Sequence, residues 1–364
     1  MLSAMGTPGV EFWTVRLALP GVTVRWAVRA EEEGWDGVGI GDSQNLAADP
    51  FAELALVAAA TSRLRLATAV TNPVTRHPAV TAAAIVTVQA ESGGRAMLGV
   101  GRGDSALAHL GMSPLPVGAF THYLRRLQGY LRGDEVAFDL ETDARGPVQS
   151  SEALHMAGGP SGSRLQWLKA DLPKVPVDVF ATGPRVIAAA ATLADRITFA
   201  VGADPARLRW AIDLARSARR SAGLDADAQP MGVFLPVVVH PDRMRARALI
   251  SGGAASFARF SVMHGTVSGP VSDAQRHALE DVYAAYDMNS HFSAGSPQSA
   301  AVNDELIDGF AIAGPASYCA ERLAELAELG LDRIAIIAGV AGADPDEMRD
   351  SRRRLVTEVL PALR

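Results

Sequence analysis

The chain is poor in features that mark several specialised classes of protein. Its 364 residues include a single cysteine, Cys319, so no disulfide can form within the chain, as is usual in a reducing compartment. No apolar run reaches the roughly 18 residues that a membrane-spanning helix needs. Residues 1–12 lack the basic start and apolar core of a signal peptide. We therefore expect a soluble, cytoplasmic protein, in which Cys319 is a small buried side chain and not a nucleophile.

Charge and residue spacing exclude further classes. The formal net charge is −6 at pH 7, which argues against a nucleic-acid partner, because such partners are bound by clustered Lys and Arg. The eight histidines show neither H-E-x-x-H nor H-x-x-E-H spacing, so we expect no metal site. No G-x-S-x-G motif is present, which removes the usual nucleophile of serine hydrolases.

The chain does have a repeated alternation of short apolar runs and longer segments of helical period. The expected strands are residues 12–17, 36–41, 64–70, 95–101, 177–182, 196–201, 232–240 and 332–337. The expected helices are residues 21–33, 51–61, 78–91, 119–132, 184–193, 205–222, 315–329 and 345–363. Eight strands, each followed by helical sequence, favour an α/β fold of the closed (β/α)8 type, a TIM barrel, over an open sheet.

Two stretches interrupt the alternation. Residues 133–175, after the fourth strand, are rich in Gly, Pro and Ser, and residues 241–308, after the seventh, are helical but irregular. We interpret both as insertions within one barrel domain that spans residues 1–364, since α/β barrels of this length are common. In such barrels the chemistry lies on the loops that follow the strands.

The loop after the fifth strand has the composition of an anion site. Thr182, Gly183, Pro184 and Arg185 run directly into a helix. Free amides at a helix N-terminus attract anions, and a guanidinium adds a charge-assisted contact to phosphate. The alternative is a well-capped turn in which Thr182 caps the helix.

The loop after the fourth strand contains three glycines and an arginine. Gly99, Gly101 and Gly103 allow a close approach of backbone to ligand, and Arg102 suits a phosphate or a carboxylate. The spacing is not the G-x-G-x-x-G of dinucleotide sites, and the lysine of a P-loop is missing. An unusual barrel turn that binds no ligand is the alternative.

Polar residues also follow the second and third strands. Asp42 is placed to accept a hydrogen bond from a ring or ribityl group, or else to cap a helix. His109, in the fourth loop, is a candidate proton donor. His77 precedes Pro78 at a helix start, which favours a structural hydrogen bond.

Four segments resemble the luciferase-like monooxygenase superfamily, in the branch of coenzyme F420-dependent oxidoreductases similar to methylenetetrahydromethanopterin reductase. They are TSRLRLATAVTNPVTRHPAVTA, GGRAMLGVGRGDSALAHLG, ATGPRVIAAAATLAD and AGPASYCAERLAELAELGLDRIAI. The runs TNPVTRHP and GRGDSALAHLG are the more specific; the others are shared across the superfamily.

The resemblance implies roles for particular residues. In such enzymes the third strand carries a non-prolyl cis peptide bond beneath the tricyclic ring, which would fall here at Ala69–Val70. The residues expected to bind cofactor are Asp42, Ser43, Ala69, Val70, Thr71, Asn72, Arg102, Gly103, Thr182, Gly183, Pro184 and Arg185. Ser43 and Ala108 stand where the superfamily's sugar-phosphate dehydrogenases have a His and, nearby, a Glu, which argues against glucose-6-phosphate oxidation.

Three functions follow as hypotheses. The first is an F420-dependent oxidoreductase that exchanges a hydride with a small organic substrate, with His109 or Asp42 as the catalytic proton donor. The second is an FMN-dependent monooxygenase, which would need a flavin reductase as partner. The third is a non-catalytic flavin-binding barrel. We also expect a homodimer that pairs through the helices near strands two to four, as barrels of this superfamily usually do.

Overall fold

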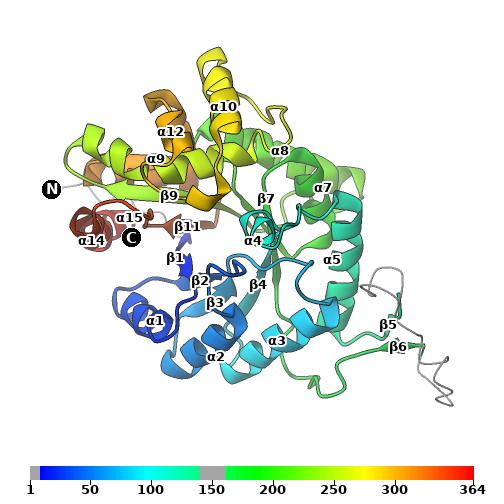
Figure 1. Cartoon of the computed structure of the whole chain (residues 1–364). Coiled ribbons are helices and arrows are strands. Elements are labelled where there is room, and N and C mark those ends of the chain that lie inside the picture. Colours follow the sequence, from blue (N-terminus) through cyan, green and yellow to red (C-terminus); the bar gives the residue numbers. More distant parts are fainter. Residues whose placement is uncertain (1–8, 140–160) are drawn as a thin grey trace.

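The computed structural model describes residues 9–139 and 161–364. Eight parallel strands form the central sheet (Figure 1). They are β1 (Glu11–Leu17), β2 (Gly37–Gly41), β3 (Arg65–Thr68), β4 (Ala96–Val100), β7 (Val177–Ala181), β8 (Arg196–Phe199), β9 (Met231–Val239) and β11 (Arg333–Ile337). Residues 1–8, where a signal peptide would begin, and 140–160, part of the predicted insertion 133–175, lie outside the described residues.

The sheet closes on itself, which confirms the predicted (β/α)8 barrel. The ladder runs without interruption from β9 through β11, β1, β2, β3, β4 and β7 to β8. The pairing of β8 with β9, in which Ile197 lies opposite Met231, completes the ring. Because all eight strands are parallel, their carboxyl ends and the following loops lie at one rim.

The helices surround the barrel and cover its strands (Figure 1). The helices of the repeating units are α1 (Thr23–Glu32), α2 (Pro50–Ala60), α3 (Pro78–Glu91), α5 (Val117–Arg132), α7 (Pro184–Leu193), α8 (Pro205–Ser221), α13 (Ala316–Ala327) and α14 (Pro345–Arg354). Four begin after an Asp or His that accepts hydrogen bonds from first-turn amides, as Asp204 does for α8. His77 caps α3 in this way, so its structural role is confirmed, whereas Asp42 caps no helix.

Most predicted ends differ from the observed ones by no more than two residues, and two of the differences have structural consequences. The third strand ends at Thr68 and not at residue 70, and the chain rejoins β4 only through the bridge between Thr71 and Val100. The predicted closing helix 345–363 consists of α14, a π-helical turn (Leu355–Val359) and α15 (Leu360–Leu363). Pro361 has no N–H to donate four residues back, which disfavours a regular α-helix just before it.

Residues 241–308 form a helical layer beside the barrel rim. Its elements are α9 (Arg243–Phe260), α10 (Asp273–Ala285), the 3-10 turn η2 (Met288–Ser290), α11 (Pro297–Ala300) and α12 (Asp304–Phe310), followed by the short strand β10 (Ile312–Gly314). Figure 1 shows α9, α10 and α12 grouped on one side. The short helix α4 (Ser105–Ala108) lies near the centre of the same view. That 241–308 and 133–175 are insertions within a single domain stays a prediction; the described part of the latter contains the small pair β5 (Val136–Ala137) and β6 (Gly162–Ser163).

The barrel interior is apolar with one buried ionic group. Trp13, Ala67 and Met97 form part of its inner cluster. Arg333 lies 4.0 Å from the Trp13 ring centre and pairs with Glu11 at 2.8 Å. Outside the barrel, Cys319 is fully buried as expected, and burial raises the pKa of its thiol to about 12. Within the described residues, no helix is long and apolar enough to cross a membrane.

Gly99 provides a test of how tightly β3 and β4 pack just below the rim. A Cβ on Gly99 would lie 2.0 Å from the Thr68 carbonyl oxygen, which is backbone and cannot move aside. We expect Gly99→Ala to lower the free energy of unfolding by about 1–3 kcal/mol, the usual cost of overpacking. The measurement is urea unfolding followed by circular dichroism.

Gly118, in the first turn of α5, is the matched control. A Cβ there meets nothing within 4 Å, so Gly118→Ala should be neutral or stabilise the protein slightly. Equal effects of the two substitutions would show that the contact between β3 and β4 is not tight.

Candidate functional site

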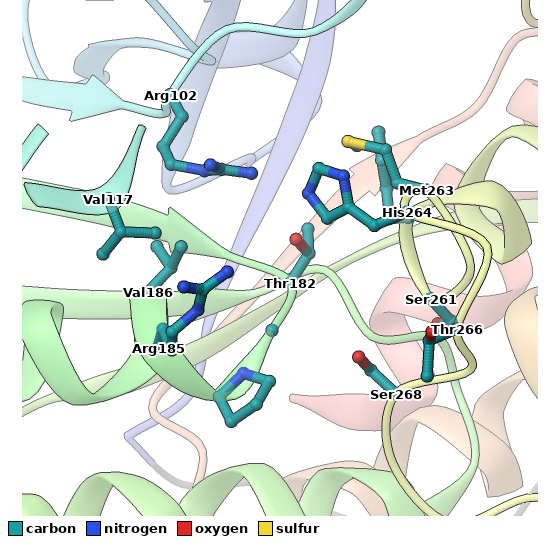
Figure 2. Close-up of a pocket in the computed structure, with 13 residues that line it drawn as sticks. Arg102, Val117, Thr182, Arg185, Val186, Ser261, Met263, His264, Thr266 and Ser268 are labelled. Atoms are coloured by element: carbon teal, nitrogen blue, oxygen red, sulfur yellow. The ribbon is translucent and has the colours of Figure 1, made fainter. Parts of the chain in front are cut away.

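A pocket of about 150 Å³ lies where the loops after β4 and β7 meet the end of α9. One wall consists of Arg102, Thr182, Gly183, Pro184 and Arg185, all predicted from the sequence. In Figure 2 the Arg102 side chain, the Thr182 hydroxyl and the Arg185 side chain converge on this space. The structure therefore brings together the two loops that the sequence predicts to bind an anion.

The turn after β7 leaves the helix N-terminus open. The N-cap residue of α7 is Gly183, and no side chain caps the helix, so the alternative in which Thr182 serves as the cap is wrong. A Cβ on Gly183 would meet nothing within 4 Å, so open space lies beside it. Pro184 has no amide proton and the Val186 N–H donates to the Gly183 carbonyl at 3.1 Å, so the Arg185 amide and the positive end of the helix dipole are what the turn offers to an anion.

Neither of the two arginines of the pocket forms an ion pair with an acid of the described residues. Arg102 donates from Nη1 to the Leu115 carbonyl at 3.0 Å, and Arg185 is exposed with no ion pair among the described residues. Burial, and next the neighbouring Arg185 guanidinium, lowers the pKa of Arg102, while Asp104 acts in the opposite direction. Two guanidiniums this close repel one another, and a phosphate between them would relieve that repulsion.

The opposite wall was not predicted. It consists of Phe260, Ser261, Met263, His264, Thr266 and Ser268, from the end of α9 and the loop beyond it. Figure 2 shows the His264 imidazole directed across the pocket toward Arg102 and Thr182. Local sequence pattern gives no signal that this loop faces residue 182, because the contact depends on how the layer 241–308 packs.

A single buried arginine holds this second wall. Arg207, on α8, has no solvent exposure and donates to the Ser268 carbonyl at 3.1 Å and to the Ser261 hydroxyl at 2.6 Å. It also donates to the carbonyls of Val201 and Pro270 and lies over the Phe310 ring. Burial lowers the pKa of Arg207 to about 10, so the side chain is still charged at neutral pH. Arg207 is thus a positioning residue for the pocket.

The rim at β3 has the backbone form expected from the resemblance. The peptide bond between Ala69 and Val70 is cis, which confirms that prediction. The Ala69 N–H donates to the Ile40 carbonyl at 2.8 Å, and the Thr71 N–H donates to the Gly99 carbonyl at 3.0 Å. The segment is therefore tied to both neighbouring strands, β2 and β4.

Asp42 is the centre of a polar group beside this segment. Its carboxylate is buried and accepts from the Thr71 hydroxyl at 2.7 Å, from Gln44 at 2.6 Å and from Arg76 at 2.5 Å. A carboxylate with three donors, one of them a guanidinium, fixes Thr71 and is poorly placed to release a proton. Ser43 lies next to it, partly buried, at the start of the same loop.

The third and fourth loops contact each other beside Asp42. Asn72 is buried and accepts from the amides of Val74 and Thr75, which stiffens the loop. Gly103 has a φ of +84°, and a Cβ there would lie 2.4 Å from Leu107, so glycine is required. His109 ends α4 with its Nε2 buried and without a hydrogen-bond partner among the described residues.

A second polar group joins the fourth loop to the helical layer. Asp104 forms an ion pair with Arg259, whose guanidinium lies 4.6 Å from the Tyr286 ring centre. Tyr286 in turn is 2.5 Å from Nδ1 of His291. Of this polar group the sequence predicted only the fourth loop. The other residues lie up to 187 positions away from Asp104, and no motif links them to it. Within the described ranges, no group of three or more potential ligands could hold a metal ion.

Comparison with known proteins identifies the family. The model of the family described as luciferase-like monooxygenase matches residues 16–333. The chain belongs to the luciferase-like monooxygenase family. Two curated relatives of this luciferase-like chain are 5,10-methylenetetrahydromethanopterin reductases. That of Archaeoglobus fulgidus is 28% identical over 92% of the chain and 93% of the relative, and that of Methanolobus tindarius is 26% identical over 85% and 87%.

A solved structure supports the fold. The coenzyme F420-dependent tetrahydromethanopterin reductase of Methanopyrus kandleri superposes with a TM-score of 0.72 at 20% identity, over 98% of this chain and 99% of that one. The curated relatives are reductases, and this luciferase-like chain is an enzyme of the same broad class, the oxidoreductases.

Substitution of Arg207 tests whether this side chain holds the second wall of the pocket in place. We expect Arg207→Met to lower the free energy of unfolding by more than about 2 kcal/mol, since buried carbonyls lose their donor. Arg209→Met, at an exposed position on the same helix, should change it by less than about 0.5 kcal/mol. The measurement is denaturant unfolding, and comparable losses in both variants would contradict the positioning role.

Proposed function

We propose that this protein is a coenzyme F420-dependent oxidoreductase that moves a hydride between the deazaflavin ring and a small organic substrate. The observation that carries the proposal is the open anion pocket, which lies on the same rim as the cis-peptide segment of β3. A phosphorylated tricyclic cofactor needs an anion site for its phosphate and a flat surface against which its ring can lie. The F420 dependence of the M. kandleri reductase supports the choice of cofactor.

The residues present fit such a cofactor. Its phosphate would lie against Thr182, Gly183 and the guanidiniums of Arg102 and Arg185, neither of which is ion-paired among residues 9–139 and 161–364. Its ring would lie over Ala69 and Val70. Thr71 and Asn72, held by Asp42 and Gln44, would border it, with Ser43 and Gly103 near by. When bound, F420 supplies a ring carbon that gives or takes a hydride.

The chain itself would orient the ring and the substrate, exclude water from the site and transfer a proton. The network around Asp42 would fix the backbone on one side of the ring site. The layer α9–α12, on the side of the barrel away from α2 and α3 (Figure 1), would cover the other. Between the two predicted donors, the geometry favours His109, whose Nε2 is unengaged, over Asp42, which already accepts three hydrogen bonds. Orientation of this kind accounts for much of the rate gain in hydride transfer.

The alternative is an FMN-dependent monooxygenase supplied by a separate flavin reductase. FMN carries a terminal phosphate that the same pocket would accept, so the pocket alone does not separate the two cofactors. Titration of the apoprotein with F420 and with FMN, followed by quenching of tryptophan fluorescence, decides between them. We expect the tighter dissociation constant for F420; tight binding of FMN alone would overturn the proposal.

Arg102 tests the phosphate site directly. We expect Arg102→Ala to weaken F420 binding by about 1.5–3 kcal/mol, because a hydrogen bond to a charged group is lost. This is roughly a 10- to 150-fold rise in the dissociation constant. Arg125→Ala, at an exposed position on α5, is the control and should bind as the unaltered protein does. An unchanged dissociation constant for Arg102→Ala would remove Arg102 from the site.

We further propose a homodimer through α2 and α3. These helices are neighbours on the barrel's outside, and each presents a large apolar side chain to solvent, Leu56 at 57% and Val80 at 56% exposure. Leu56→Glu should shift the mass measured by light scattering from dimer to monomer at micromolar concentration. Met244→Glu, at a 78% exposed position on α9, should leave the dimer intact. A monomeric mass for the unaltered chain would contradict this proposal.

A further inference from the structure

The strongest unassigned feature is the polar chain that ends at His291. It begins at Ser256 on α9, passes through Tyr286 and reaches Nδ1 of His291, with contacts of 3.2 and 2.5 Å. None of these residues belongs to the anion pocket or to the network around Asp42. Nε2 of His291 has no hydrogen-bond partner within residues 9–139 and 161–364, and the side chain is partly buried.

The direction of the hydrogen bonds follows from a count of protons. The Ser256 hydroxyl donates to the Gly252 carbonyl at 3.0 Å and therefore receives the proton of Tyr286. Tyr286 then has no proton left for His291, so its oxygen accepts from Nδ1–H of the imidazole. Neutral imidazole carries one proton, which leaves Nε2 with a free lone pair.

The imidazole is held in its neutral form. Burial lowers the pKa of His291 to about 4, and the charges of Arg259 and His109 act in the same direction while Asp104 opposes them. These three groups, with Tyr286, are the titratable side chains that act on His291. Asp104 and His109 belong to the fourth loop, and Arg259 is ion-paired to it. Direct contacts run from His291 through Tyr286 and Arg259 to Asp104, on the loop that borders the proposed ring site.

We propose that His291 is a substrate-contacting catalytic residue, whose Nε2 accepts a hydrogen bond from a hydroxyl or secondary amine on the carbon that exchanges hydride. This rests on the proposed function. In the oxidative direction the C–H bond breaks and its hydride passes to oxidised F420. The O–H or N–H proton passes to Nε2 of His291 and not to His109, the better placed of the two candidates from the sequence, and C=O or C=N forms. The substrate class is thus an alcohol or a secondary amine with a hydrogen on the adjacent carbon.

Tyr286 is a positioning residue in this scheme. It fixes Nδ1–H and so keeps the lone pair on Nε2, and Arg259, lying over its ring, ties it to Asp104. Phe292, the next residue, packs its ring 6.3 Å from that of Phe257 on α9, which anchors the segment. The same chain of contacts would orient the imidazole before any substrate arrives.

The first test is spectroscopic and uses the full chain loaded with F420. Long-range proton–nitrogen NMR of histidine-labelled protein should show His291 with Nδ1 protonated and Nε2 bare at pH 7. The Nε2 resonance should move when cyclohexanol or N-methylaniline is added as probe. A protonated Nε2, or no shift with either probe, would overturn the proposal. Loss of the resonance in His291→Gln assigns it.

The second test measures single-turnover reduction of F420 by the same probes. General-base catalysis contributes about 100- to 10,000-fold, so His291→Gln should slow this step at least 100-fold with the F420 dissociation constant unchanged. Tyr286→Phe should slow it about tenfold and lose the fixed tautomer. His277→Gln, on exposed α10, is the matched control and should react as the unaltered protein does. A fall of less than threefold in His291→Gln would refute the role.

The outcomes separate this inference from the proposed function. If the unaltered protein does not bind F420, the proposed function fails, and the NMR test on the apoprotein with the same probes decides on His291. If F420 binds and neither probe is turned over, the NMR test still decides on His291. Movement of its Nε2 resonance with a probe supports substrate contact, and no movement overturns it.

Discussion

The site depends on the closure of the parallel ladder between β8 and β9. With that pairing in place, the loops after β2, β3, β4 and β7 share one rim with the layer that follows β9. Without it, the two walls of the anion pocket would belong to opposite edges of an open sheet. The close contact of Gly99 with the Thr68 carbonyl illustrates how little freedom the closed ladder leaves at the rim.

Two kinds of electrostatic environment lie side by side on that rim. In the pocket at Arg102 and Arg185, neither guanidinium is ion-paired with an acid of the described residues, so the pocket is electropositive and the two cations repel one another. Asp104 has a guanidinium partner of its own, Arg259, whereas Asp42 shares Arg76 with Asp49. Positive charge is therefore in excess at the pocket, while the networks that hold the loops contain at least as many carboxylates as guanidiniums.

Buried polar side chains link these environments to the outer layers. Arg207 connects α8 to the loop at residues 261–270, and Arg259 connects α9 to Asp104. Arg207 donates to carbonyl oxygens and Arg259 to a carboxylate, at positions that are buried or partly buried. Such groups fix one arrangement of the loops, because any other would leave several polar atoms unsatisfied.

The sequence by itself determined the barrel, the order of its elements and one wall of the anion pocket. These follow from local patterns: apolar runs of strand length, helices begun by Asp or Pro, and a glycine-arginine loop. The resemblance located the cis bond at Ala69–Val70. Only the tertiary structure decided the second wall, the role of Arg207 and the chain from Ser256 to His291. Those contacts join residues that are distant in sequence through packing of the layer 241–308, and no local periodicity records which side chain of one layer will meet which loop of another.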